Sequence, residues 1–422
     1  MNYKKTELKN GLRIITVPMQ ETQTVTMSIG VSVGSRYEKE KEAGISHFIE
    51  HMLFKGTKKR PTALSISEEL DAIGGEFNAF TSKDSTYYYA KSDARHLETV
   101  LDVISDMYLN SKIEEKEIQK EKNTIIQEIN MYNDMPMRMV EDVFENLLYR
   151  KNSLGESIAG SKKTVASFRR KNFFDYMRRF YIPNETVVCV AGKFDETKTI
   201  NLIGKIFSDM KKKEKAKIVP VEENQKNPQL KIKFKKTDQT HLILGTRGYE
   251  KKNKDRYALA LLATILGGNM SSRIFIEVRE RRGLAYYVST GTESFEDVGY
   301  LTTRAGVEHK NLALAIETIL AEYKKIAKEK VTEKELQKAK DYIKGKTVMG
   351  LEATEAVAMF FSGQAVDREK ILNLEEKFAL IDKVDADDIL RVARDIFQNK
   401  KLNLAIVGPH KNSKEFQKIL NL

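Results

Sequence analysis

The pattern of apolar and polar residues predicts several strands near the start of the chain, followed by a group of helices. Residues 13–18, 24–34 and 86–92 alternate in polarity or run continuously apolar, as strands do. Residues 96–110 and 113–132 instead repeat their apolar positions at helical spacing. Because the strands come in hairpin-like pairs and the helices gather in blocks, the pattern favours an α+β layer structure with a largely antiparallel sheet.

This pattern occurs twice in the chain. Residues 113–128 match residues 331–346 at a constant offset of 218 residues, and both segments are rich in Glu, Lys and Gln. The sequences VVCVAG (187–192) and LNLAIVG (402–408) close the two copies alike, each after a basic amphipathic helix. An internal repeat of this length predicts two homologous α/β domains packed on their own cores.

A charged segment separates the two copies. Residues 209–229 contain the run Lys211 to Lys215 and two prolines, a composition typical of a linker. We therefore expect an N-terminal domain at 1–217 and a C-terminal domain at 218–422.

Composition narrows the class of protein. The chain has 422 residues, 41% of them hydrophobic, which suffices for two cores. Its net charge of +12 comes from lysines spread among glutamates, and no nucleic-acid motif accompanies them, so we expect no nucleic-acid partner. The single cysteine, Cys189, excludes an internal disulfide and favours a reducing compartment. With no apolar signal core and no apolar run of membrane length, we expect a cytoplasmic protein without a membrane partner.

Candidate chemistry appears in the segment His47-Phe48-Ile49-Glu50-His51. In a helix the two histidines lie one turn apart on one face, where both imidazoles can reach one ion, and Glu50 lies beside them. A catalytic zinc takes three protein ligands and leaves a position for water. The alternative is a pair of histidines that meet solvent or a carbonyl, but these polar residues interrupt an apolar stretch, where unpaired polar groups are costly to bury.

The third ligand is expected on another element. Glu121 and Glu128 lie two turns apart on one face of the predicted helix, and either could serve. The repeat offers a test, because a single metal site in one copy predicts joint loss of its residues from the other. Upstream, Tyr37-Glu38-Lys39 corresponds to Tyr249-Glu250-Lys251 at an offset of 212, and at this offset His47, Glu50 and His51 become Leu259, Leu262 and Ala263. At the offset of 218, Glu121 and Glu128 become Ala339 and Lys346.

These residues resemble the inverzincin zinc peptidases of the pitrilysin and mitochondrial processing peptidase family. The resemblance covers essentially the whole chain and is carried by GISHFIEHMLFKGTKKRP (44–61), GGEFNAFTSKDSTYYY (74–89), the Glu121 and Glu128 helix, and LGGNMSSRIFIEVRERRGLAYYV (266–288). It implies one Zn²⁺ per chain on His47, His51 and Glu128, with Glu50 as general base and Glu121 supporting the ligands. It also implies two homologous α/β domains that form half of a clam-like chamber.

The resemblance extends to residues that contact substrate. It implies that Arg279 and Tyr286, from the second copy, hold the scissile carbonyl, although the residues alone fit an ordinary cationic cluster and a strand aromatic. It also implies that an edge strand pairs with an extended substrate. The alternative is that this strand is an ordinary edge strand of a hairpin without a role in binding. The strand includes Asn78, Ala79, Phe80 and Thr81.

Together these observations predict a zinc metalloendopeptidase that cleaves peptides or unfolded polypeptides inside a dimeric chamber. A homodimer is expected because one chain carries both the zinc motif and the Arg279 and Tyr286 pair. The alternatives are a non-catalytic scaffold subunit of the same fold and a basic nucleic-acid-binding protein. No long glycine-rich insertion is present, which weakens a strict presequence-processing role.

Overall fold

Each copy of the repeat forms one β-sheet, and each sheet organises one unit of the structure. The computed structural model describes residues 1–215, 217–368 and 370–422. The backbone forms two compact units, each drawn from three segments of the chain. Unit 1 comprises Met1–Ile129, Glu156–Val219 and Val348–Glu375, and unit 2 comprises Asn130–Gly155, Pro220–Thr347 and Glu376–Leu422.

The sheet of unit 1 has six strands in the order β1-β2-β6-β3-β5-β4. Only the β2 and β6 pair is parallel; the other neighbours are antiparallel. The strands are β1 (Lys4–Glu7), β2 (Arg13–Pro18), β3 (Thr24–Val31), β4 (Glu76–Thr81), β5 (Thr86–Asp93) and β6 (Thr186–Gly192). Strand β4 therefore lies at an edge of the sheet.

The sheet of unit 2 repeats this order as β7-β11-β8-β10-β9, without a counterpart of β1. Its one parallel pair, β7 and β11, corresponds to β2 and β6. The strands are β7 (Gln229–Phe234), β8 (Thr240–Gly248), β9 (Ala285–Ser294), β10 (Gly299–Val307) and β11 (Leu402–Gly408). The predicted fold class, two homologous α/β units with largely antiparallel sheets, is confirmed.

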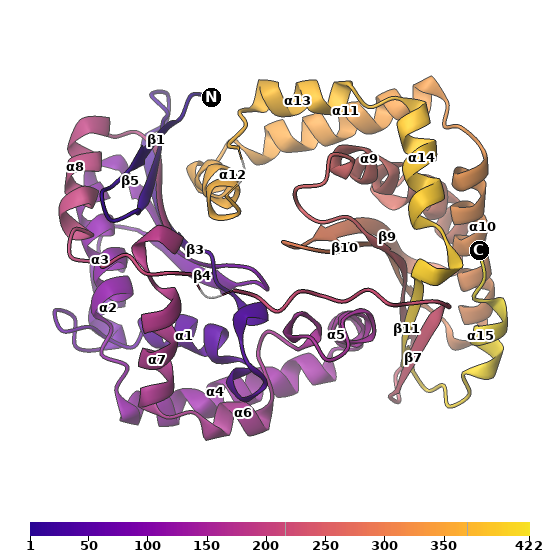
Figure 1. Ribbon diagram of the computed structural model, residues 1–422, viewed down its shortest axis with the longest axis horizontal. Helices are drawn as coiled ribbons and strands as arrows, with labels where there is room; N and C mark the ends of the chain where they lie inside the picture. Colours follow the sequence, from indigo (N-terminus) through magenta and orange to yellow (C-terminus); the bar gives the residue numbers. More distant parts are fainter. Residues whose placement is uncertain (216, 369) are drawn as a thin grey trace. The chain divides into compact units, whose positions relative to one another are not determined.

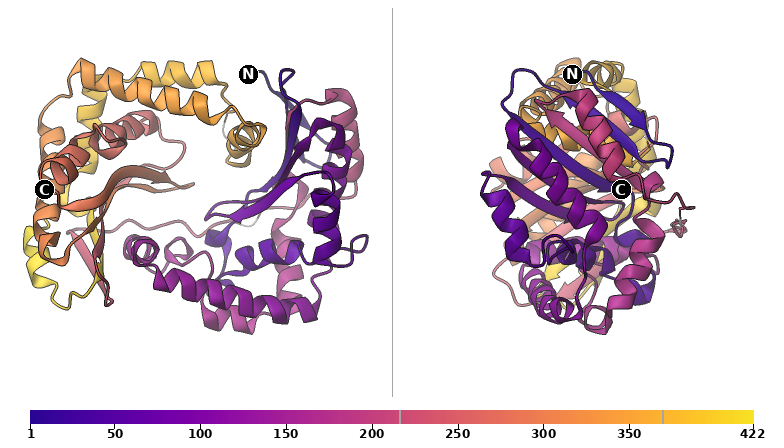
Figure 2. Two further views of the ribbon diagram at one scale, coloured as in Figure 1. Left: turned by 180° about the vertical axis from the view of Figure 1, so that it is seen from behind. Right: turned by 90° about the vertical axis from the view of Figure 1, so that its left-hand side faces the viewer.

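Helices cover both faces of the sheet in unit 1, because alternate strand residues are apolar on each side. Ile14 and Val188 face a core formed with α1, α3 and α7, whereas Ile15 and Cys189 face the opposite core. Figures 1 and 2 show the first group of helices against the sheet. The helices of this group and their neighbours are α1 (Ile45–Leu53), α2 (Ala63–Asp71), α3 (Leu97–Asn110), α4 (Glu115–Asp134), α6 (Lys162–Ser167), α7 (Arg170–Phe180) and α8 (Glu196–Ile206).

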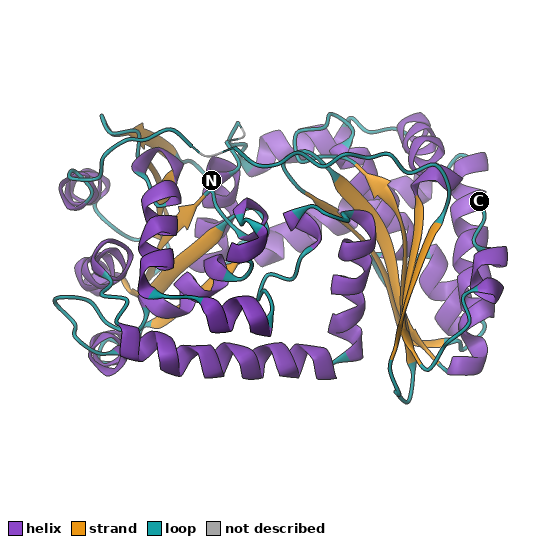
Figure 3. Cartoon of the chain, turned by 60° about the horizontal axis from the view of Figure 1, so that its bottom comes forward, coloured by secondary structure: helices purple, strands orange, loops and turns teal. Residues whose placement is uncertain are grey.

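The sheet of unit 2 is likewise covered on both faces (Figure 3). Helices α9, α10 and α14 contribute to its larger core. The helices that follow β8 in the chain, apart from one that belongs to unit 1, are α9 (Arg256–Gly267), α10 (Leu312–Lys328), α11 (Glu333–Gly350), α13 (Leu374–Asp382), α14 (Ala386–Ile396) and α15 (Lys414–Ile419). Among the described residues, no helix combines the length and the apolar character needed to cross a bilayer.

The second face of each sheet is covered by a helix from the other copy of the repeat. Helix α5 (Pro136–Leu148) packs on the sheet of unit 2, with Phe144 beside Tyr300. Helix α12 (Thr354–Val366) packs on the sheet of unit 1, with Phe361 among its buried residues. The units therefore differ from the continuous segments 1–217 and 218–422, because each sheet buries its second face under a helix encoded in the other copy. The boundary between the two repeats stays a prediction.

Candidate metal centre

Helix α1 carries the two histidines, and its first turn is held by a carboxylate from outside the helix. The turn before it needs Gly44, whose φ is 93° and where a Cβ would lie 2.7 Å from the carbonyl oxygen of Ala159. No side chain at Gly44 can cap the helix, and Glu38 does so instead: its two oxygens accept the N–H groups of Gly44 at 2.7 Å and Ser46 at 2.8 Å. The apolar residues of α1 are buried, which fixes the direction of His47 and His51.

Helix α4 supplies the carboxylates from its buried stripe. Ile118, Glu121, Ile125 and Glu128 follow one another at spacings of three and four residues, so they share a helical face. Two carboxylates thus stand where apolar residues are expected. Glu121 is buried and Glu128 half-buried. Glutamates at such positions need partners, and both find them on α1.

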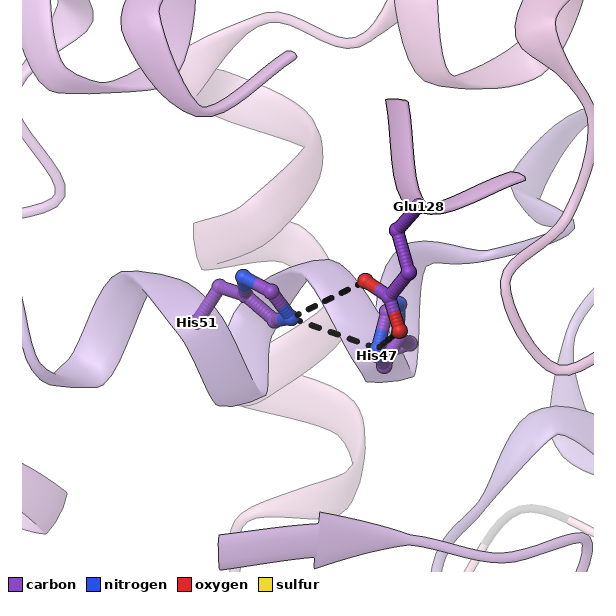
Figure 4. A group of neighbouring side chains, drawn as sticks. All are labelled: His47, His51 and Glu128. Atoms are coloured by element: carbon purple, nitrogen blue, oxygen red, sulfur yellow. Dashed lines mark hydrogen bonds and ion pairs between the residues drawn. The ribbon is translucent and has the colours of Figure 1, made fainter. Parts of the chain in front are cut away.

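His47, His51 and Glu128 converge on one point (Figure 4). The Nε2 atoms of the two histidines lie 3.2 Å apart. The carboxylate of Glu128 places one oxygen 3.5 Å from Nε2 of His47 and the other 3.7 Å from Nε2 of His51. Ligands about 2.1 Å from a tetrahedral zinc stand roughly 3.3 to 3.5 Å from one another. The two nitrogens and the carboxylate oxygens therefore lie close to the spacing of a zinc site with three protein ligands, and they have its donor chemistry.

Glu121 fixes the orientation of His51. Its Oε1 lies 2.8 Å from Nδ1 of His51, and its Oε2 lies 2.6 Å from Nζ of Lys55. A neutral His51 that donates from Nδ1 to Glu121 keeps a lone pair on Nε2, the atom that faces His47 and Glu128. Glu128 faces the convergence point and Glu121 lies behind His51, so the geometry favours Glu128 as the third ligand, and that assignment stays a prediction.

His47 lacks a comparable support on its other nitrogen. Within the described parts of the chain, Nδ1 of His47 is buried without a hydrogen-bond partner. Burial, together with the neighbouring His51, lowers the pKa of His47. Burial also lowers the pKa of His51, but the hydrogen bond and charge of Glu121 outweigh it and leave that pKa raised. A neutral His47 is the form that can bind a metal.

Glu50 lies near His51 and Glu128, and a hydrogen bond joins it to the edge strand. Its Oε2 accepts a hydrogen bond of 2.5 Å from the hydroxyl of Thr81, the last residue of β4. Burial raises the pKa of Glu50, and the Thr81 hydrogen bond opposes that rise. Sequence reasoning placed Thr81 on the substrate strand but did not foresee this hydrogen bond. It also missed the roles of Glu38 and of Lys55, although Lys55 lies within the segment 44–61.

Of the other strand residues, Asn78 and Phe80 are exposed and Ala79 is half-buried. Strand β4 pairs only with β5 among the described strands, so its other edge is available for hydrogen bonding. The predicted edge position is therefore present. Substrate binding at that edge stays a prediction.

Arg279 and Tyr286 lie together in unit 2. Arg279 belongs to the π-helix η6 (Phe275–Glu280), and Tyr286 lies on β9. The guanidinium carbon of Arg279 is 5.8 Å from the ring centre of Tyr286 and 5.0 Å from that of Phe275. The side chain of Tyr286 is 78% exposed, so its hydroxyl is open to a ligand.

The corresponding positions of unit 2 hold no such centre. Leu259, Leu262 and Ala263 on α9 are buried, and so is Ala339 on α11. Lys346 is exposed. In the portion of the chain that the structure describes, His47, His51 and Glu128 are the one group of three potential metal ligands that converges.

Two family models match the chain. Residues 13–162 match the family described as Insulinase (Peptidase family M16), and residues 167–343 match the Peptidase M16 inactive domain. The chain belongs to Peptidase family M16, which confirms the resemblance seen in the sequence.

Relatives of full length carry the same assignment. A protein of Bacillus subtilis, named an uncharacterized zinc protease, is 36% identical over 409 residues, which cover 97% of this chain and 99% of that protein. A protein of Rickettsia felis with the same description is 36% identical over 410 residues, covering 97% and 98%. The crystal structure of a protease from Helicobacter pylori has a TM-score of 0.90 at 24% identity, covering 97% of this chain and 99% of that chain, and supports the fold.

Proposed function

We propose that this chain is a zinc-dependent metalloendopeptidase that hydrolyses peptides or unfolded polypeptides. One Zn²⁺ per chain is held by His47, His51 and Glu128. The observation that carries the proposal is the convergence of these side chains: the two Nε2 atoms lie 3.2 Å apart, and the two oxygens of Glu128 lie 3.5 Å from Nε2 of His47 and 3.7 Å from Nε2 of His51. The relatives of full length are named uncharacterized zinc proteases, which supports the same chemistry.

The residues of the centre divide the reaction between them. A bound zinc supplies Lewis-acid polarisation of the peptide carbonyl and lowers the pKa of water. Glu50 takes the proton of the attacking water and later returns it to the leaving amine. The Thr81 hydroxyl holds the Glu50 carboxylate in position through its hydrogen bond. Glu121 keeps Nε2 of His51 unprotonated by accepting from Nδ1.

Substrate is held by groups from both copies of the repeat in this proposal. The free edge of β4, at Asn78, Ala79, Phe80 and Thr81, pairs with an extended peptide through backbone hydrogen bonds, which tolerates many sequences. The hydroxyl of Tyr286 stabilises the oxyanion that forms on the scissile carbonyl, and Arg279 contacts the substrate beside it. Both side chains are close enough to act as one pair.

The variant Glu50→Gln tests this function. It should retain zinc, measured by elemental analysis, and lose hydrolysis of a peptide library followed by mass spectrometry. Glu68→Gln makes the same chemical change at an exposed position of α2 and should leave both properties unchanged. Unchanged turnover in Glu50→Gln would exclude Glu50 as the general base.

The alternative function is a non-catalytic scaffold subunit of the same fold. The match of residues 167–343 to a domain described as inactive bears on this alternative, but that segment excludes the zinc motif. A purified chain without zinc and without hydrolysis would favour the scaffold. The homodimeric chamber and the cytoplasmic location stay predictions, and the mass of the protein in solution tests the dimer.

A further inference from the structure

A pocket in unit 1 shares no lining residue with the metal centre. Its volume is about 360 Å³, at the small end of the range of small-molecule sites. Strands β1 and β2 form one wall, with Lys5, Glu7 and Arg13, and the end of α12 forms another, with Ala365 and Arg368. Lys212, from the segment after α8, completes its charged lining.

The charge of this lining is strongly positive. Four cations, Lys5, Arg13, Lys212 and Arg368, face a single carboxylate, that of Glu7. Arg368 also forms an ion pair with the buried Glu185, which lies outside the lining. Across the described residues, neither Lys5 nor Lys212 has a carboxylate within ion-pair distance. An excess of cations in a concave site attracts anions, because the walls exclude water and concentrate the field.

Arg13 is the unusual member of this group, because it is only 7% exposed. Its Nη1 donates to the carbonyl oxygen of Ala365 near the end of α12, an ordinary role for a cation at a helix C-terminus. Its Nε and Nη2 have no hydrogen-bond partner among the described residues. Burial and the neighbouring Arg368 lower the pKa of Arg13, whereas Glu185 and Glu7 raise it. Helix capping alone leaves two buried donors of a cation unused.

We propose that this pocket binds the phosphate groups of a small polyanion. A guanidinium offers paired donors that match phosphate oxygens, and two flexible lysines at the rim can follow a second phosphate group. The site lies apart from the peptidase chemistry in its residues, so the proposal stands whether or not the chain hydrolyses peptides. The four cations outweigh the single carboxylate of Glu7, and their net attraction grows with the charge of the anion, which favours a multiply charged ligand over chloride.

Calorimetric titration of the zinc-loaded protein with inorganic pyrophosphate tests the proposal. Lys5→Gln and Lys212→Gln remove one rim charge each at exposed positions, so the fold should remain intact. Each should weaken binding about fivefold, and the double variant by more than about tenfold, as expected for exposed charge pairs. Lys4→Gln and Lys211→Gln make the same change next to each residue, outside the pocket lining, and should leave the affinity unchanged.

Three outcomes decide the matter. Binding that weakens in the pocket variants but not in their neighbours supports the proposal. The absence of binding to the unaltered protein overturns it. An unchanged affinity for pyrophosphate in the double variant also overturns the proposal, because pyrophosphate then binds elsewhere, for example at zinc. Cosedimentation with phosphatidylglycerol vesicles, compared with free pyrophosphate, distinguishes a lipid headgroup from a soluble ligand through the same two lysines.

Arg13→Met provides a second test. It removes the buried guanidinium, and thermal unfolding checks that the variant still folds. A folded Arg13→Met protein should lose pyrophosphate binding and the rise in melting temperature that the ligand gives to the unaltered protein. A folded variant that keeps both would show that Arg13 serves only the end of α12.

Discussion

Helices α1 and α9 hold equivalent places in the repeat, yet one carries a polar centre and the other is buried in apolar packing. On α1, His47, Glu50 and His51 meet carboxylates from α4. On α9, the matching Leu259, Leu262 and Ala263 lie in the core of unit 2. The strand order is the same in both units. The comparison shows that a few substitutions in the same fold determine whether this helix presents a cluster of polar side chains or packs entirely in a hydrophobic core.

The carboxylate helices α4 and α11 differ in the same way. Glu121 and Glu128 occupy the buried stripe of α4, and Ala339 and Lys346 replace them on α11. Ala339 is buried and needs no polar partner, whereas the buried Glu121 has two polar partners, His51 and Lys55. The histidines and glutamates are thus present together in one copy and absent together from the other, because any one of them alone would be a buried or half-buried polar group without a partner.

Glu128→Gln should have the largest effect. An amide is a poor zinc ligand, so we expect loss of zinc and a fall in peptide hydrolysis of more than about a thousandfold. Lys346→Gln alters the equivalent exposed position of α11 and should change neither zinc content nor turnover. A Glu128→Gln protein that keeps both would remove Glu128 from the centre.

Tyr286→Phe should lower kcat by about 10² to 10³, the usual cost of losing one oxyanion donor, with zinc content unchanged. Tyr287→Phe is the matched control: the Tyr287 hydroxyl instead bonds Nδ1 of His241 at 2.9 Å. Steady-state kinetics on one peptide measures both variants. Equal kcat values for Tyr286→Phe and the unaltered protein would leave unit 2 without a role in the chemistry.

Glu121→Gln should weaken zinc binding by about 10- to 100-fold, because the charge that orients His51 is lost. Glu117→Gln, on the same helix, removes only an exposed ion pair with Lys120 and should leave zinc affinity unchanged. Competition with a zinc chelator measures both affinities. Identical affinities would mean that the packing of α1 holds His51 in place without the charge of Glu121.

Glu38→Gln should have a smaller effect, visible as a pH dependence of stability. Burial raises the pKa of Glu38 to about 8, although the hydrogen bonds from Ser46 and Gly44 oppose the rise. The folded state then keeps a proton that the unfolded state has already lost. The contribution of Glu38 to stability is therefore complete below its unfolded pKa and declines as pH rises towards the folded value.

The stability difference between the unaltered protein and Glu38→Gln should accordingly shrink by about 1.4 kcal/mol between about pH 6 and pH 7. Glu250 is the repeat counterpart of Glu38 but is only half-buried, so Glu250→Gln should show no such trend. Urea unfolding at each pH gives the values. Parallel curves for Glu38→Gln and Glu250→Gln would mean that the buried carboxyl stays ionised in the folded protein.

The sequence was most informative where one physical pattern determines the outcome. Alternation located β2 at 13–18 and β5 near 86–92, and the repeat identified α4 and α11 as equivalent helices. The exchange of α5 and α12 could not be predicted, because an apolar helix face does not specify which sheet it will cover. The supports of the metal centre also escaped prediction. Glu38 and Lys55 act through contacts that follow from the path of the chain, and their residue types have no distinctive spacing.

A crystal structure of the zinc-loaded protein, with anomalous scattering measured at the zinc edge, tests the central claim most directly. The account predicts one zinc peak per chain, about 2.0 to 2.2 Å from Nε2 of His47, Nε2 of His51 and a carboxylate oxygen of Glu128, and no peak beside α9. A peak held by other residues, or no zinc at all on a protein that hydrolyses peptides, would contradict it.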